Sequence, residues 1–157
     1  MDPHPFKLLI FDWEGTLALP STAPSCLYPE TLSVLSTLFD QGYLLAIATG
    51  KSKRGVAQDL QQLNLQNLIS ATCTAEECYP KPHPAMIFNI LNQLAITPQD
   101  ALMIGDTVYD LDMARQAKIQ SVGVTYGVQT REELLPYHPC TCIDTLTQLP
   151  VWLTHRK

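Results

Sequence analysis

The sequence predicts a single α/β domain built around a mainly parallel β-sheet. Short apolar runs alternate with segments of helical period along the chain, which is the pattern of strands joined by crossover helices. The length of 157 residues is typical of one domain and allows a real hydrophobic core. We find no internal repeat and no low-complexity tract, so one domain is expected to cover residues 1–157.

The expected strands are short apolar segments spaced along the whole chain. Five of them are Lys7–Phe11, Leu44–Ala48, Leu68–Ala71, Ala101–Ile104 and Ser121–Val124, and a short sixth is expected near Cys142–Ile143. The intervals between them have helical spacing, and the four clearest helices are Glu30–Asp40, Ser52–Leu63, Ala85–Leu94 and Tyr109–Ala117. Gly42 is a natural stop for the first helix, and Ser52 can cap the second.

Weaker signals define the remaining segments. Thr130 and Glu133 have capping-box spacing for a short helix near Arg131–Leu135. A final, proline-interrupted helix is expected around Leu146–Leu153. The segment Ala18–Tyr28 carries two prolines and three small hydroxyl residues, which predicts a loop.

Composition and charge exclude several classes of protein. The net charge of −5 comes from 15 acidic and 10 basic residues with mixed signs, so no basic stripe is present and nucleic acid is not expected as the main ligand. No apolar run approaches the roughly 20 residues that span a bilayer. The start MDPHPFKLLIF is a poor signal peptide, and the five cysteines lack paired C-x-x-C spacing, so a cytoplasmic protein with reduced thiols is expected.

Polar residues follow the expected strands at the points where ligands bind in an open parallel sheet. Each of these residues offers a carboxylate, a hydroxyl, a backbone amide or an ammonium group. They are Asp12, Glu14 and Thr16 after the first strand, Thr49 and Gly50 after the second, Lys81 beyond the third, and Asp106 and Asp110 after the fourth.

This set suits phosphoryl transfer from a monoester. Asp12 can attack phosphorus and form an aspartyl-phosphate, which splits one difficult step into two. Mg²⁺ held by carboxylate and carbonyl oxygens, together with Lys81, can compensate the negative charge. Thr49 and backbone amides can hold the phosphoryl oxygens. Glu14 can protonate the leaving alkoxide and then activate water.

Each of these residues also has a simpler structural role. A single Asp at a strand end is more often a cap or turn former, and Asp110 can be a first-turn acid favoured by the helix dipole. Lys81 can be a solvated loop lysine. Lys51, Lys53 and Arg54 can attract an anionic substrate or can form a solvated helix start. The joint order of signals after four successive strands favours the functional interpretation.

The same residues resemble a known family. FDWEGTL looks like motif I of the haloacid dehalogenase-like superfamily, whose pattern is D-x-D-G-T, while ATGKS, KPHP and GDTVYD look like motifs II, III and IV. Stretches such as ALMIGDTVYDLDMARQAKIQSVGVTYGV are similar to the phosphoglycolate phosphatase-like branch. The resemblance covers nearly the whole chain. It implies a Rossmann-like, three-layer fold with strand order 5-4-1-2-3.

The resemblance also implies residue roles. Asp12 is the implied nucleophile, and Glu14 stands at the acid/base position. The implied metal ligands, all oxygen donors for Mg²⁺, are Asp12, the main-chain carbonyl of Glu14, Asp106 and Asp110. The implied phosphate-binding residues are Thr49, Gly50 and Lys81. The implied function is a Mg²⁺-dependent phosphomonoester hydrolase, with phosphoglycolate as one candidate substrate.

The sequence departs from the family pattern in two places. Glu14 stands where the family has aspartate, and a misplacement of about 1 Å can cost on the order of a hundredfold in rate. Only a short loop, residues 17–28, stands where the branch inserts a cap domain. A capless core is expected to accept a small phosphorylated metabolite, with a neighbouring subunit covering the site, or a phosphorylated macromolecule. The alternative from another class is a non-catalytic binding or regulatory domain.

Overall fold

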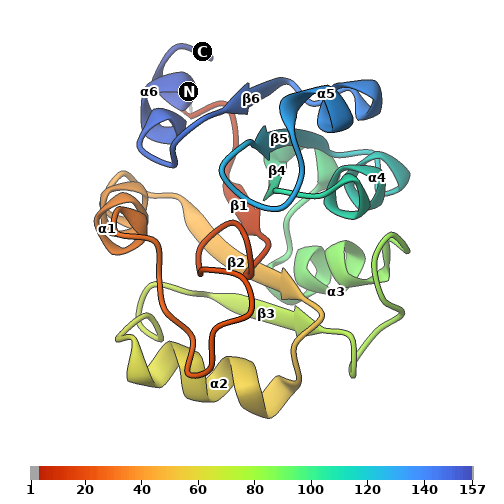
Figure 1. The fold of residues 1–157 in the computed structure, drawn as a ribbon. Helices are drawn as coiled ribbons and strands as arrows, with labels where there is room; N and C mark the ends of the chain where they lie inside the picture. Colours follow the sequence, from red (N-terminus) through yellow and green to blue (C-terminus); the bar gives the residue numbers. More distant parts are fainter. Residues whose placement is uncertain (1–3, 157) are drawn as a thin grey trace.

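The computed structural model describes residues 4–156 and contains a six-stranded parallel sheet in that part of the chain (Figure 1). Its strands are β1 Leu8–Phe11, β2 Leu44–Thr49, β3 Ala71–Thr74, β4 Ala101–Gly105, β5 Gln120–Val124 and β6 Thr141–Ile143. The strand order is β3-β2-β1-β4-β5-β6. The expected order 5-4-1-2-3 is therefore confirmed, read from the other edge, and β6 extends the sheet beside β5. Residues 1–3 and 157 of the expected domain lie outside the described residues.

Helices cover both faces of the sheet and make three layers (Figure 1). One face carries α1 Thr31–Asp40, α2 Lys53–Gln62 and α6 Gln148–Thr154. The other face carries α3 Ala85–Leu94 and α4 Val108–Gln116, and the short α5 Arg131–Leu134 packs beside α4. Single 3₁₀ turns occur at Pro98–Asp100 and Leu135–Tyr137.

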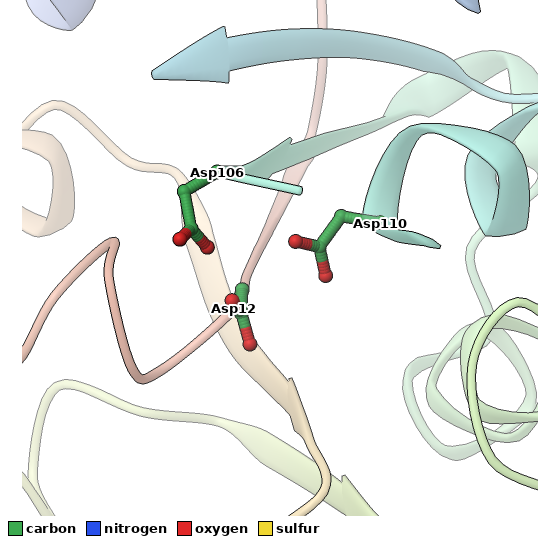
Figure 2. A group of neighbouring side chains, drawn as sticks. All are labelled: Asp12, Asp106 and Asp110. Carbon is green, nitrogen blue, oxygen red and sulfur yellow. The ribbon is translucent and has the colours of Figure 1, made fainter. Parts of the chain in front are cut away.

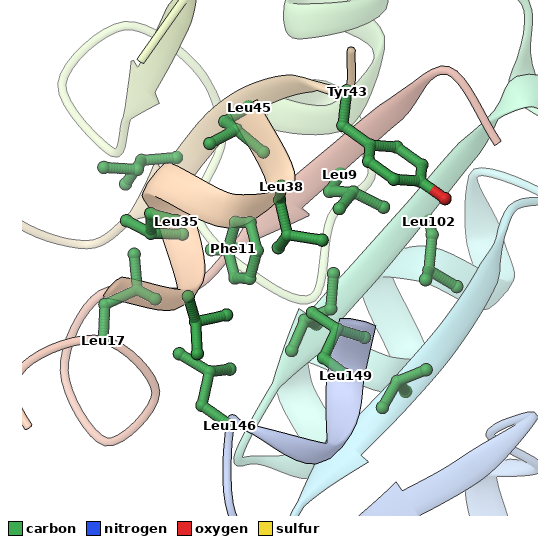
Figure 3. Close-up of a cluster of buried hydrophobic side chains, with 14 of the residues drawn as sticks. Leu9, Phe11, Leu17, Leu35, Leu38, Tyr43, Leu45, Leu102, Leu146 and Leu149 are labelled. Carbon is green, nitrogen blue, oxygen red and sulfur yellow. The ribbon is translucent and has the colours of Figure 1, made fainter. Parts of the chain in front are cut away.

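The central strand β1 is buried from both sides. Leu9 and Phe11 point into the core that α1, α2 and α6 cover, and Figure 3 shows this cluster. Leu8 and Ile10 point into the opposite core, beneath α3 and α4. All four side chains have no exposed surface, as expected for a parallel strand between two helical layers. This double packing fixes the position at which β1 ends.

Most element boundaries agree with the sequence within one or two residues. Ser52 caps α2 by accepting a hydrogen bond from the Gly55 amide at 3.0 Å. The helix α4 begins at Val108, one residue earlier than expected, because Thr107 and Asp110 form a capping box. Gly42, with φ of +98°, follows α1 as expected.

The third strand was predicted in the wrong place. It runs over Ala71–Thr74, so the expected segment Leu68–Ala71 shares only Ala71 with it. The Leu68 and Ile69 amides instead donate to the Leu65 carbonyl, at 2.9 and 3.2 Å, in a turn that follows α2. Their side chains are half-buried against the core below, so their hydrophobicity serves a turn rather than a strand.

The last helix is not interrupted by proline. Pro150 is the third residue of α6, which begins at Gln148 rather than Leu146. An amide in the first turn of a helix has no intrahelical acceptor, so proline is tolerated there. Among the described residues, no helix combines the length and apolar character needed to cross a membrane.

Candidate active site

The register of the sheet brings the polar strand ends to one edge. Phe11 pairs with Ile47 of β2 and with Ile104 of β4, and the Asp12 amide donates to the Ile104 carbonyl at 3.0 Å. The polar residues that follow these strands therefore leave the sheet at the same level. A cleft of about 660 Å³ opens there, and all the predicted site residues line it: Asp12, Glu14, Thr49, Gly50, Lys81, Asp106 and Asp110.

Three aspartates form the acidic floor of this cleft (Figure 2). Asp12 follows β1, Asp106 follows β4, and Asp110 lies in the first turn of α4. Each offers one carboxylate oxygen, and the three oxygens lie within 4.8 Å of one another. All three residues are buried, with exposed fractions of 8%, 0% and 0%. Such a group can hold a metal ion.

Lys81 joins two of the three aspartates. Its Nζ lies 2.7 Å from Asp12 Oδ1 and 2.7 Å from Asp110 Oδ1. Its side chain is 13% exposed, so both contacts are largely shielded from water. One ammonium group facing three carboxylates leaves an excess of negative charge, which favours binding of a cation.

The pKa values of this cluster follow from burial and charge. Burial raises the pKa of Asp12 to about 6, against the opposing charge of Lys81 and with a further upward contribution from Asp106. Burial, then the charge of Asp12, raises the pKa of Asp110 to about 6, while Lys81 and Thr107 oppose the shift. Burial alone would lower the pKa of Lys81, but Asp110 and Asp12 together raise it above its ordinary value.

Asp106 and Asp110 are held in place by their neighbours. Asp106 accepts hydrogen bonds from Thr16 Oγ1 at 3.3 Å and from the Val128 amide at 2.9 Å. One oxygen of Asp110 accepts from the Thr107 amide at 3.1 Å and the Thr107 hydroxyl at 2.9 Å, while the other contacts Lys81. Each carboxylate is thus oriented before any ligand arrives.

The remaining predicted residues form the walls. Thr49 is the last residue of β2 and is 2% exposed, and its Oγ1 accepts a hydrogen bond from the Lys51 amide at 3.2 Å. Gly50 faces open space, since a Cβ atom built on it would have no neighbour within 4 Å. Glu14 has an exposed side chain at the cleft.

The 17–28 loop, expected from the sequence in place of a cap, adds a wall to the cleft. Pro20 and Ser21 line the cleft. The base of the loop is fixed, because the buried Thr31 hydroxyl donates to the Leu17 carbonyl at 2.8 Å and the Leu19 amide donates to the Cys26 carbonyl at 2.8 Å. The loop is therefore an ordered part of the cleft.

Thr107, Tyr109 and Val128 also line the cleft and were not predicted. The T-x-x-D spacing of Thr107 and Asp110 is a capping-box signal that would have identified Thr107. Val128 comes from a loop after β5, and no local pattern points to it.

The sequence also matches the model of a known hydrolase family. The model for haloacid dehalogenase-like hydrolases matches residues 21–124, so the chain belongs to that family. The matched segment contains Thr49, Lys81, Asp106 and Asp110, whereas Asp12 and Glu14 precede it.

Curated relatives carry phosphatase names. A probable phosphatase from Dickeya dadantii, IndB, is 33% identical over 128 residues, which are 81% of this chain and 56% of that protein. A phosphoglycolate phosphatase from Colwellia psychrerythraea is 34% identical over 82% of this chain and 58% of its own length. The pyrophosphatase PpaX from Anoxybacillus flavithermus is 28% identical over 78% of this chain and 57% of its own. The chain thus spans about half the length of these relatives.

Solved structures have the same fold. A predicted phosphoglycolate phosphatase from Haemophilus somnus superimposes with a TM-score of 0.84 at 21% identity, over 94% of this chain and 98% of that one. A haloacid dehalogenase-like family hydrolase from Streptococcus pneumoniae gives a TM-score of 0.81 at 19% identity, over 94% and 98% of the two chains. At these identities the likeness establishes the fold alone.

Proposed function

We propose that this chain hydrolyses phosphomonoesters with the help of Mg²⁺, through an aspartyl-phosphate on Asp12. The observation that carries the proposal is the buried arrangement of Asp12, Asp106 and Asp110 around Lys81 at the floor of an open cleft. Phosphatase names among relatives that share the family support the same reaction class.

The donor set fits Mg²⁺. This ion prefers carboxylate and carbonyl oxygens, and the three aspartates offer oxygens within 4.8 Å of one another. Asp12, Asp106, Asp110 and the main-chain carbonyl of Glu14 would hold it. When bound, the ion supplies positive charge beside the phosphoryl group and so reduces the repulsion between an anionic nucleophile and an anionic substrate.

Residues of the chain have separate roles in the two steps of the reaction. An Asp12 carboxylate oxygen attacks phosphorus, the bond to the leaving oxygen breaks, and Glu14 donates a proton to that oxygen. Lys81, Thr49 and Gly50 hold the phosphoryl oxygens. In the second step Glu14 accepts a proton from water, which attacks phosphorus, releases inorganic phosphate and regenerates Asp12.

The shape of the cleft favours small phosphorylated substrates that reach the floor without a covering domain. We infer that the 17–28 loop, with Pro20 and Ser21 on the cleft wall, stands in place of a cap. Caps exclude water and select the leaving group, so a short loop predicts broad selectivity. Phosphoglycolate and pyrophosphate, which the names of relatives mention, are the first substrates to test.

The decisive experiment measures turnover of an aryl phosphate with Mg²⁺ and with a chelator. Wild-type protein is compared with Asp12→Asn and with the control Asp100→Asn, whose carboxylate makes a surface ion pair with Lys7. We expect turnover that requires Mg²⁺, persists in the control and disappears in Asp12→Asn. Turnover no higher than that of Asp12→Asn would instead favour the alternative, a non-catalytic domain that retains the fold.

A further inference from the structure

One cationic side chain in the cleft is not used by the proposed reaction. Lys51 lies between Gly50 and the start of α2 and lines the cleft. Its side chain is 23% exposed and its Nζ lies 3.2 Å from Asp59 Oδ2. Lys53 and Arg54, which the sequence offered on equal terms, are exposed on the surface. The structure therefore separates Lys51 from its two basic neighbours.

Asp59 ties Lys51 to the rest of the cleft wall. The same Oδ2 atom accepts a hydrogen bond from Ser25 Oγ at 2.7 Å. Ser25 Oγ in turn accepts from Trp13 Nε1 at 3.3 Å, and Trp13 precedes Glu14 and follows Asp12 in the chain. A chain of contacts thus connects the nucleophile segment, the 17–28 loop and Lys51.

Lys51 has a structural partner in Asp59 as well as a place on the cleft wall. Lys51 precedes the N-cap Ser52, and its side chain extends along α2 so that the ammonium reaches Asp59 in the second turn of the helix. The pair compensates the charge of Asp59, and the same contact fixes the position of the ammonium. Asp59 is only 9% exposed, so Lys51 is held by a nearly buried partner rather than by a flexible surface group. A held cation at a cleft wall is suited to binding an anion.

In the proposed reaction Lys81, Thr49 and Gly50 hold the transferred phosphoryl group, so Lys51 is left for a different anion. Among the described residues, Lys51 forms its ion pair with Asp59, while Asp12 and Asp110 are paired with Lys81. The Lys51 ammonium has three N–H donors, so its contact with Asp59 leaves capacity for a further acceptor.

We propose that Lys51 binds a second anionic group, carried on the leaving part of the substrate. The preferred substrates of this cleft are therefore phosphomonoesters or phosphoanhydrides whose leaving group bears a carboxylate or another phosphate. This inference rests on the proposed phosphatase function and adds the class of leaving group to it.

The test measures binding, so that it does not depend on turnover. Calorimetric titrations with Mg²⁺ present use the Asp12→Asn protein, with and without Lys51→Met, and three ligands. Phosphoglycolate carries the carboxylate, pyrophosphate carries the second phosphate, and ethyl phosphate carries neither. Lys51→Arg keeps the charge, and Lys53→Met is the matched control on the exposed side of the same segment.

We expect Lys51→Met to lower the affinity for phosphoglycolate or pyrophosphate by about 10- to 100-fold relative to the affinity for ethyl phosphate, since a hydrogen bond to a charged group is lost. Lys51→Arg should keep most of the preference, and Lys53→Met should not change it. A larger loss of affinity for phosphoglycolate identifies the carboxylate as the recognised group, and a larger loss for pyrophosphate identifies the second phosphate. An equal loss for all three ligands, no loss, or no binding of any of them would overturn the role of Lys51. Failure of the phosphatase itself would be recognised separately, by the absence of aryl phosphate turnover in the wild type.

Discussion

Gly15 lies so close to Asp106 that a Cβ atom on Gly15 would stand 2.1 Å from Asp106 Oδ2. Its φ of +85° is a backbone conformation that glycine adopts without strain. The Thr16 hydroxyl, from the next residue, donates to the other oxygen of Asp106 at 3.3 Å. The turn after Asp12, the proposed nucleophile, therefore shapes the position of Asp106, a proposed metal ligand that follows a different strand.

Replacing Gly15 with alanine should damage both stability and metal binding. The left-handed conformation costs about 1–2 kcal/mol for a residue with a Cβ atom, and forcing that atom against Asp106 adds roughly 1–3 kcal/mol. We expect a clear drop in the free energy of unfolding by urea titration, and weaker Mg²⁺ binding by calorimetry. Gly50→Ala is the stability control, because the Cβ would meet open space. Equal stabilities for the two variants would contradict this view of the turn.

Lys81 offsets the charge of Asp12 and Asp110 in the metal-free protein. Lys81→Met removes that charge and leaves two buried carboxylates without a cationic partner, which costs on the order of 3–5 kcal/mol. We expect a lower melting temperature in chelator, a larger gain on adding Mg²⁺ than in the wild type, and loss of turnover. Lys7→Met removes a surface ion pair with Asp100, and such pairs contribute only about 0–1 kcal/mol. A Lys81→Met protein as stable in chelator as Lys7→Met would argue against the balancing role.

The sequence predicted the fold and the polar residues that follow the strands into the cleft, because both depend on local patterns. Apolar strand runs end at Asp12, Thr49 and Asp106, and parallel strands place their carboxyl ends at one edge. The third strand was misplaced because Leu68 and Ile69 are more hydrophobic than the small residues that form β3. Hydrophobicity alone does not separate a buried turn from a strand.

The contacts inside the cleft could not be predicted in the same way. Lys81 meets Asp12 across 69 positions and Asp110 across 29, and Ser25 meets Asp59 across 34. Such pairs depend on how distant loops fold over the sheet edge. The sequence therefore identified Lys51 only as one of three equivalent basic residues, and its ion pair with Asp59 distinguishes it from the other two.

The acidic group should make metal-free stability depend on pH. Burial raises the pKa of Asp12 and of Asp110 from 3.8 to about 6, so the folded state holds more protons than the unfolded state between these values. Stability in chelator should consequently fall as pH rises from about 4 to about 6. Urea unfolding across this range checks the sign. In Asp110→Asn, Lys81 has Asp12 as its remaining carboxylate partner in the cluster and one of the two titrating groups is gone. The dependence of stability on pH should therefore become weaker. A steep dependence unchanged in Asp110→Asn would assign it to other groups.

Mg²⁺ should restore the stability that the metal-free protein loses as pH rises, because the metal and protons compete for the same oxygens. We expect the affinity for Mg²⁺ to fall as pH is lowered through about 6, the pKa of Asp12 and Asp110. Calorimetric titrations at several pH values measure this directly. Asp106→Asn, which removes one carboxylate oxygen of the group, should lower the affinity for Mg²⁺ at every pH. An affinity that does not change with pH would place the ion elsewhere.

Glu14 is one of the two places at which the sequence departs from the motif pattern it resembles, and its side chain is exposed at the cleft. If its carboxyl group transfers the proton to the leaving group, Glu14→Gln should lower kcat by about 10²- to 10⁴-fold. Glu14→Asp shortens the side chain by one methylene group, and correcting a misplacement of about 1 Å can raise the rate by up to a hundredfold. Mg²⁺ affinity should change little in either variant, because the proposed ligand is the main-chain carbonyl. Steady-state kinetics with an aryl phosphate and with an alkyl phosphate distinguish a loss of proton transfer from a general loss of activity. The alkyl group is the poorer leaving group, so its departure depends more on protonation. Because Glu14 is also the proposed base of the second step, the comparison uses kcat/KM, which reports the first step. If Glu14→Gln reduces kcat/KM equally for both substrates, Glu14 is not the acid, and another residue or water must protonate the leaving oxygen.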